Sequence, residues 1–273
     1  MSHDFDTNWP ADVAVLIADI NDDGDNDIVI APSESSGRFS WYEASDPRSG
    51  PWLEHIIDAS VSFLHTFKAA DMDNEGDLDL VTGEMHQSTD PDEVTVYVNE
   101  GAALTWSQLP VDSTGSHNLR VGDVGNDGDL DIFGANWNDG APNSAVVDLW
   151  ENQLIGVLPL DLWERHIIET SLPWKAVFVD GRDVNGDDLP DIVTGGWWYP
   201  NPGTPGGTWT RAPSGGALGN MAVVHDFDAD GDLDILGTDG QYVGNENGRY
   251  GPRWRSRYRL DRLDPDEPGA LRK

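Results

Sequence analysis

Short apolar stretches alternate with strongly polar ones along the whole chain. Apolar runs such as VAVLIA (13–18), IVIA (28–31) and MAVVH (221–225) lie next to acidic, glycine-containing segments, and no stretch has the spacing of an amphipathic helix. Short strands separated by turn residues at regular intervals are typical of all-β repeat folds. The pattern therefore predicts an all-β chain of repeated antiparallel strands.

One acidic pattern occurs five times. The copies are DINDDGDND (19–27), DMDNEGDLD (71–79), DVGNDGDLD (123–131), DVNGDDLPD (183–191) and DFDADGDLD (226–234). Each copy lies between two apolar runs. A third apolar stretch follows, and then a segment that begins with tryptophan: Trp52, Trp106, Trp163, Trp209 or Trp254. Four short strands in each repeat are typical of a propeller blade. We expect the repeated tryptophan to pack between blades.

The repeat predicts a single all-β propeller of five four-stranded blades, with the acidic loop between strands one and two of each blade. The predicted blades are residues 10–58, 59–112, 113–169, 170–215 and 216–262. Two alternatives remain for residues 1–9: they close the ring with the last blade, or the chain is part of a larger propeller. Residues 263–273 contain two prolines and no strand pattern, which predicts a disordered tail.

The acidic loops have the spacing of a cation site. Oxygen-bearing side chains at positions 1, 3 and 5 can converge on one ion, and glycine at position 6 permits a sharp turn, as in the first half of an EF-hand loop. Here the last carboxylate is at position 9 and strands flank the loop. The pattern resembles the FG-GAP or VCBS repeats of integrin-like and bacterial propellers. That resemblance implies several structural Ca²⁺ ions, one in each loop.

By position, the metal ligands that the resemblance implies are Asp19, Asn21, Asp23 and Asp27; Asp71, Asp73, Glu75 and Asp79; Asp123, Asp127 and Asp131; Asp183, Asn185, Asp187 and Asp191; and Asp226, Asp228, Asp230 and Asp234. Two loops depart from the pattern. Gly125 removes the ligand at position 3, so we expect the third loop to bind more weakly. Asp188 replaces the glycine of the fourth loop, although Asp tolerates a left-handed backbone better than most residues.

Composition narrows the choice of partners. The chain has 16 Lys and Arg against 50 Asp and Glu, a formal net charge of -34, which argues against nucleic acid or an anionic membrane as partner. It has no Cys, which excludes disulfides and thiolate metal sites. We expect no membrane insertion, because no apolar run reaches the roughly 18 residues of a spanning helix. No signal peptide is visible, but the resemblance favours an extracellular or periplasmic location.

Candidate chemistry lies at the opposite end of each hairpin from its acidic loop. His65 and His117 lie six residues before their loops, and Glu84 and Asn136 lie five residues after. Antiparallel pairing brings such positions together. The full set of catalytic candidates is His65, Glu84, His86, His117 and Asn136. The candidates for ligand binding are Trp137, Trp197, Trp198 and Asp239.

The innermost strands of a propeller surround its central axis, so we expect these residues to ring one mouth of the central channel, here called the axial pocket. Several functions fit this axial pocket. The first is a binding site for a small polar molecule or a glycan in a calcium-stabilised propeller. The second is a metal-dependent hydrolase or lyase, in which His65, Glu84 and His117 hold a further divalent metal that activates water against a phosphoester, lactone or uronide. A third is a fragment of a larger adhesion or carbohydrate-active protein. Alternatively, each His only hydrogen-bonds the backbone of the adjacent blade.

Overall fold

The computed structural model contains strands and no helix among the residues it describes. The described residues are 6, 8–10, 12–44, 46, 48, 51–85, 88, 91–136, 146–153, 162–171, 178–194, 197–204, 206–213, 220–227, 229, 231, 233–238 and 258–262. This part of the chain has no helix of the length and apolar character that crossing a membrane requires.

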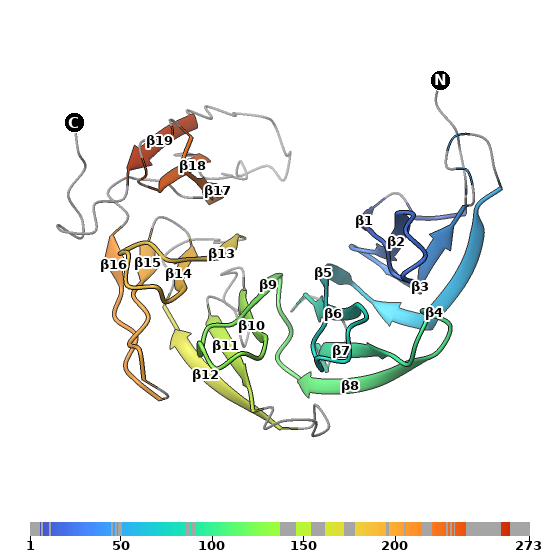
Figure 1. Ribbon diagram of the computed structural model, residues 1–273, viewed down its shortest axis with the longest axis horizontal. Coiled ribbons are helices and arrows are strands. Elements are labelled where there is room, and N and C mark those ends of the chain that lie inside the picture. Colours follow the sequence, from blue (N-terminus) through green and yellow to red (C-terminus); the bar gives the residue numbers. More distant parts are fainter. Residues whose placement is uncertain are drawn as a thin grey trace, which may run out of the picture. The chain divides into compact units, whose positions relative to one another are not determined.

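The strands form repeated antiparallel sheets, four of them four-stranded and the last three-stranded (Figure 1). The first contains β1 (Val13–Ala18), β2 (Asp27–Pro32), β3 (Ser36–Glu43) and β4 (Leu53–Ser62), and the second β5 (Leu64–Ala70), β6 (Asp79–Glu84), β7 (Val94–Asn99) and β8 (Trp106–Asp112). The third contains β9 (Asn118–Gly122), β10 (Asp131–Ala135), β11 (Val147–Asn152) and β12 (Trp163–Glu169). The fourth contains β13 (Val179–Arg182), β14 (Asp191–Thr194), β15 (Trp197–Tyr199) and β16 (Ala212–Pro213), and the fifth β17 (Asn220–His225), β18 (Asp234–Thr238) and β19 (Tyr258–Arg262).

In each sheet the strands are neighbours in chain order, as the repeat predicts. The acidic loop joins the first two strands: Ala18 pairs with Asp27, and Ala70 with Asp79. The second strand, between two neighbours, is buried on both faces in the first three sheets, which explains its continuous apolar run. These repeated sheets are consistent with a propeller-like fold. Closure of a five-bladed ring stays a prediction.

One boundary differs in detail from the predicted repeats, and one sheet has fewer described strands than the predicted four. Strand β4 continues past residue 58 to Ser62, because Val61 and Ser62 still pair with Gly37 and Ser36 of β3. In the fifth sheet the described strands are three, since β18 pairs with β17 on one side and β19 on the other. The predicted tail, 263–273, lies outside the described residues.

The hydrophobic core lies between successive sheets. One cluster joins Phe39 and Trp41 of the first sheet to Phe67 and Tyr97 of the second, with Trp106 packed against it. A second joins residues of the second and third sheets, with Trp163 packed against it. The prediction that the repeated tryptophan packs between sheets is therefore confirmed for these two. Trp254 lies outside the described residues.

By its internal contacts the chain divides into two compact units. The first is 1–121, 129–134 and 150–165, and the second is 122–128, 135–149 and 166–273. The first two sheets lie in the first unit, and the last two lie in the second. Boundaries between the units fall within each strand of the third sheet.

Candidate functional site

All five acidic loops have positive φ at the same two positions. Their fourth and sixth residues have positive φ: Asp22 and Gly24, Asn74 and Gly76, Asn126 and Gly128, Gly186 and Asp188, and Ala229 and Gly231. The left-handed region is easiest for Gly and tolerable for Asn and Asp. In the fourth loop the glycine has moved to the fourth position and Asp188 takes the sixth with φ 67°. The departure in sequence therefore leaves the turn unchanged.

The first carboxylate of each loop holds this turn. In every loop the backbone N–H of the sixth residue donates to Oδ2 of the first Asp, at distances from 2.9 Å in the first loop to 3.1 Å in the third. In the first loop the N–H of Asp23 also lies 3.0 Å from Oδ1 of Asp19 and 3.2 Å from Oδ1 of Asn21. The oxygens at positions 1 and 3 are thus drawn to the same side of the turn.

The carboxylate at position 9 connects each loop to its sheet. Asp27, Asp79, Asp131, Asp191 and Asp234 are all almost completely buried. In the second loop, Oδ2 of Asp79 accepts the N–H of Met72 at 2.8 Å, and Oδ1 accepts the N–H of Asn99 at 2.8 Å. The position-9 residue therefore has a structural task in addition to any ligand role.

Burial of these carboxylates has an electrostatic cost. Desolvation raises the pKa of Asp79 to about 7 and the pKa values of Asp27 and Asp191 to about 6. The backbone N–H donors oppose this rise, and the neighbouring loop carboxylates add to it. A cation in the loop would favour the ionised forms of all these groups.

The second loop brings its ligand atoms closest to a cation site. Oxygens of Asp71, Asp73 and Asp79 all lie within 4.8 Å of one another. Three carboxylates in a glycine-containing turn form a donor set that suits a hard ion such as Ca²⁺. In the third loop Gly125 offers no side chain, as the sequence indicates, and Asp228 and Asp230 of the fifth loop lie outside the described residues.

His65 and His117 of the predicted axial pocket meet. Their ring centroids are 4.0 Å apart, with the ring planes inclined at 45°. Nδ1 of His65 lies 2.9 Å from the carbonyl oxygen of His117, to which it donates, and Nε2 of His65 lies 3.6 Å from Oε1 of Glu34. His117 is buried and His65 is partly exposed. His65 thus makes the backbone contact to an adjacent sheet that a structural role requires.

Glu84 is engaged with backbone groups near this pair. Its Oε1 accepts the N–H of Ser62 at 3.1 Å, and its Oε2 accepts the N–H of Glu93 at 3.3 Å. Burial raises its pKa. Within the described ranges, the groups of three ligand atoms closer than 4.8 Å include neither His65, Glu84 nor His117. A catalytic metal held by these three residues stays a prediction without a preformed cluster.

The remaining candidates are buried, partly exposed or outside the described residues. Asn136 is buried, and its N–H donates to the carbonyl of Val146 at 2.9 Å. Trp197 is partly exposed, with the Arg211 guanidinium 5.4 Å from its ring centroid. Trp198 is only 3% exposed and packs in an apolar cluster with Val193, so its expected role in ligand binding stays a prediction that this burial does not favour. His86, Trp137 and Asp239 lie outside the described residues.

A repeated asparagine was missed at the sequence level. Asn99 donates through Nδ2 to the carbonyl of Ile20 in the preceding repeat and to that of Leu78 in its own, each at 3.3 Å. Asn152 and Asn201 make the equivalent pairs of contacts, Asn152 to Met72 and Leu130 and Asn201 to Val124 and Pro190. The signal was present in the segments YVNE, LWEN and YPNP, where Asn follows the third apolar stretch of three successive repeats.

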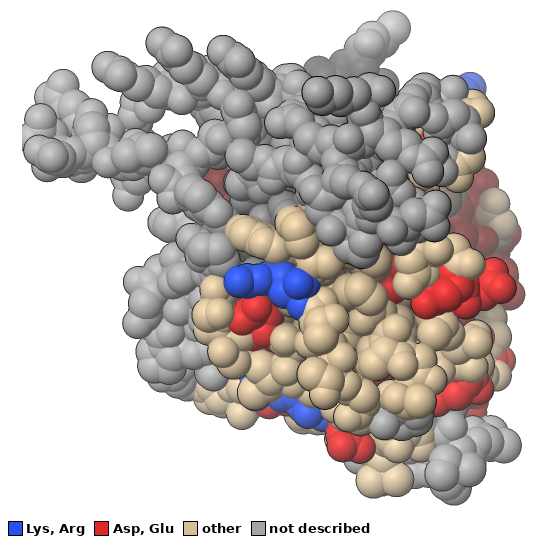
Figure 2. Space-filling model, turned by 90° about the vertical axis from the view of Figure 1, so that its left-hand side faces the viewer, with Lys and Arg blue, Asp and Glu red and all other residues tan. Residues whose placement is uncertain are grey.

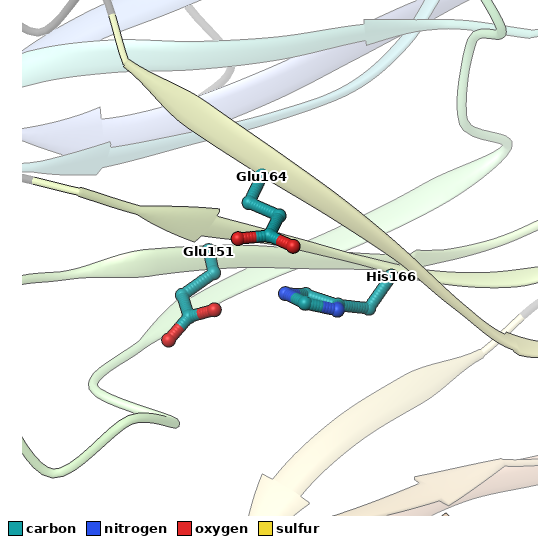
Figure 3. A group of neighbouring side chains, drawn as sticks. All are labelled: Glu151, Glu164 and His166. Atoms are coloured by element: carbon teal, nitrogen blue, oxygen red, sulfur yellow. The ribbon is translucent and has the colours of Figure 1, made fainter. Parts of the chain in front are cut away.

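A mixed cluster of ligating side chains was also missed. Glu151 of β11 and Glu164 and His166 of β12 each place a ligand atom within 4.8 Å of the others (Figure 3). The signal was the similarity of WERHIIE (163–169) to WLEHIID (52–58), which places His at one position of both repeats.

Comparison with known proteins supports the repeat assignment. Residues 19–82 match the family model of the FG-GAP-like repeat, so this resemblance is confirmed for the segment from the first acidic loop to β6. A lectin from Agrocybe aegerita that specifically recognises non-reducing terminal N-acetylglucosamine is similar in structure, with a TM-score of 0.56 and 17% identity. The alignment covers 95% of this chain and 68% of the lectin.

The V. cholerae biofilm matrix protein Bap1 is similar with a TM-score of 0.53 and 16% identity. Here the alignment covers 96% of this chain but 38% of Bap1, so this chain corresponds to well under half of that protein. At these identities the two structures are evidence about the fold.

Proposed function

We propose that this chain, which carries an FG-GAP-like repeat, is a calcium-stabilised extracellular propeller that binds carbohydrate. The observation that carries the proposal is the similarity over 95% of the chain to a lectin that recognises terminal N-acetylglucosamine. The biofilm matrix protein, which is similar over 96% of the chain, agrees with a location outside the cell. The five equivalent acidic loops supply the argument for calcium.

In this proposal the calcium ions are structural. The loop carboxylates already accept backbone N–H groups, and an ion that bridges them would lower the repulsion among as many as five acidic residues in nine positions. Binding to the folded state alone stabilises it by mass action. We therefore assign the loops to stability and carbohydrate recognition to another place.

We place the carbohydrate at the His65–His117 end of β5 and β9. Side chains there offer acceptors to sugar hydroxyl groups: Nε2 of His65, whose Nδ1–H donates to the backbone, and the half-exposed carboxylate of Glu34, 3.6 Å away. The pair also joins two successive sheets, since Nδ1 of His65 donates to the carbonyl of His117. A ligand there would contact both repeats.

Surface charge favours a neutral sugar over a polyanion. On the described part of the face in Figure 2, Lys and Arg side chains form small areas beside acidic ones, without a broad basic surface. With a formal net charge of -34, the protein repels polyanions at long range.

A glycan array followed by calorimetric titration tests the proposal. We expect the calcium-saturated protein to bind glycans with terminal N-acetylglucosamine, and Glu34→Gln and His65→Ala to weaken binding by about tenfold, or about 1.4 kcal/mol. The matched control is His55→Ala, which removes a histidine that stacks on Trp41 instead, with ring centroids 4.2 Å apart. Absence of binding to any array glycan, or equal loss in the His55 variant, would contradict the proposal.

A further inference from the structure

We propose that Lys68 and Arg120 form a binding site for the carboxylate group of a small, singly charged ligand. Lys68 lies on β5 and Arg120 on β9, the first strands of the second and third sheets. Each lies three residues before the first Asp of its acidic loop, so the two positions are equivalent in successive repeats. Both belong to the first compact unit. The site goes beyond the proposed carbohydrate binding and does not depend on it.

Strand geometry directs Lys68 toward the third sheet. Phe67 packs in the cluster shared with the first sheet, and successive residues of a strand face opposite sides, so Lys68 faces the third sheet. Val81, which pairs directly with Lys68, packs in the cluster shared with the third sheet, as this orientation requires. Strands β5 and β9 also contact each other, since the N–H of Leu119 donates to Oγ1 of Thr66 at 3.4 Å.

The ammonium group of Lys68 lacks an acidic partner within the described ranges. Its Nζ donates to the carbonyl of Phe67 at 2.9 Å, and the ion pairs among the described residues do not include it. An ammonium group has three donor hydrogens, so two remain for water or a ligand. Lys68 is also partly buried, and a buried charge without an opposite charge is unfavourable. A carboxylate from a ligand would supply both the acceptor and the opposite charge.

Arg120 adds a second positive charge beside Lys68. Its Nη1 donates to Oδ1 of Asn118 at 2.7 Å and to the carbonyl of Leu119 at 2.9 Å, which holds the guanidinium group against its own strand. Burial, and after it the positive charge of Arg120, lower the pKa of Lys68 to about 8, so the two charges lie near each other. At pH 7 Lys68 is still mostly protonated and pairs with an anion.

The charge of the whole chain limits which anions reach this site. A formal net charge of -34 repels polyanions at long range, so sulfated polymers and nucleic acids are disfavoured. A small molecule with one carboxylate meets less of this repulsion because it carries a single charge. That carboxylate belongs either to an acidic sugar such as glucuronate or to a simple organic acid, and Lys68 would recognise the same group in both.

Calorimetric titration of the full chain with sodium glucuronate, in excess CaCl₂ to saturate the acidic loops and at constant ionic strength, tests the site. We expect one glucuronate per chain, no binding of the neutral sugar glucose, and an affinity reduced by about tenfold or more in Lys68→Gln. The matched control is Arg182→Gln, which also removes one positive charge, but from an exposed side chain that is paired with Asp180 at 3.6 Å. It should bind glucuronate like the unaltered protein.

A parallel titration with sodium acetate distinguishes the two sources of the carboxylate. Equal affinities for acetate and glucuronate would identify the ligand as a simple organic acid, and tighter binding of glucuronate would identify it as an acidic sugar. Protection from amine labelling gives a second measurement, on the unaltered protein. Acetylation with N-hydroxysuccinimidyl acetate, followed by peptide mass spectrometry, should modify Lys68 more slowly when glucuronate is present and Lys273 at the same rate.

Four results would overturn the proposal. They are no binding of either carboxylate, unchanged affinity for glucuronate in Lys68→Gln, an equal loss in Arg182→Gln, or labelling of Lys68 that glucuronate does not slow. Thermal unfolding of each variant in calcium verifies that it is folded before titration. Glycan binding that persists in Lys68→Gln while glucuronate binding is lost would separate the two sites, so either proposal can fail alone.

Discussion

The hydrogen bonds of the Asn99 side chain allow a quantitative prediction about how strongly successive repeats are joined. Its Nδ2 donates to the carbonyls of Ile20 and Leu78, and its Oδ1 accepts the N–H groups of Gly101 at 3.0 Å and Ala103 at 2.9 Å. The side chain is 3% exposed, so in Asn99→Ala most of these partners lose their hydrogen bonds without access to water.

The magnitude follows from this count. Four hydrogen bonds at about 0.5–1.5 kcal/mol each give about 2–6 kcal/mol. Gly101 is exposed and its N–H regains water, so we expect Asn99→Ala to lower the free energy of unfolding by about 3 kcal/mol. At roughly 2–4 °C for each kcal/mol, the midpoint of thermal unfolding should fall by about 6–12 °C.

Urea denaturation in saturating CaCl₂, followed by tryptophan fluorescence, measures this change. The control is Gln108→Ala in the same repeat, which removes an exposed contact to Asp58 at 2.8 Å and should change stability by less than about 0.5 kcal/mol. A loss below about 1 kcal/mol in Asn99→Ala would refute the reasoning, since the link between repeats would then contribute no more than one ordinary hydrogen bond.

Two further predictions concern the acidic loops. Asp188→Gly should stabilise the protein by about 0.5 kcal/mol in urea denaturation, because Gly adopts φ 67° without strain; a loss of stability would contradict this. Without calcium, the unfolding free energy should rise as the pH falls from about 7 to about 4. The pKa values of Asp27, Asp79 and Asp191 in the folded state, at about 6 to 7, lie above the unfolded value of about 3.9, so the folded form binds more protons there. Urea midpoints in EDTA should show this slope, and it should be smaller in Asp79→Asn; equal slopes would contradict the assignment.

The sequence predicted the repeated sheets because each repeat carries a local signal. The acidic loop marks the junction of the first two strands, and the pairing of Ala70 with Asp79 places that junction where the motif does. The spacing from the loop also predicted that His65 and His117 would lie close together, because both lie six residues before the acidic loop and so occupy equivalent positions in two successive repeats.

Other features could not be obtained from spacing. Trp198 lies next to Trp197 in sequence, yet one side chain is partly exposed and the other buried, because successive residues of a strand face opposite sides of the sheet. The role of Asn99 depends on a carbonyl in the preceding repeat, and that of Glu84 on backbone groups of two other segments. Such contacts depend on tertiary packing.

Thermal unfolding with and without calcium tests the central claim, that the acidic loops are cation sites which stabilise this fold. The same protein is melted in excess EDTA and in CaCl₂, at matched ionic strength. Each site occupied at a hundred times its dissociation constant should add about 2.7 kcal/mol to the folded state, so the midpoint should rise and continue to rise with calcium concentration. An identical midpoint in EDTA and in CaCl₂ would contradict the account.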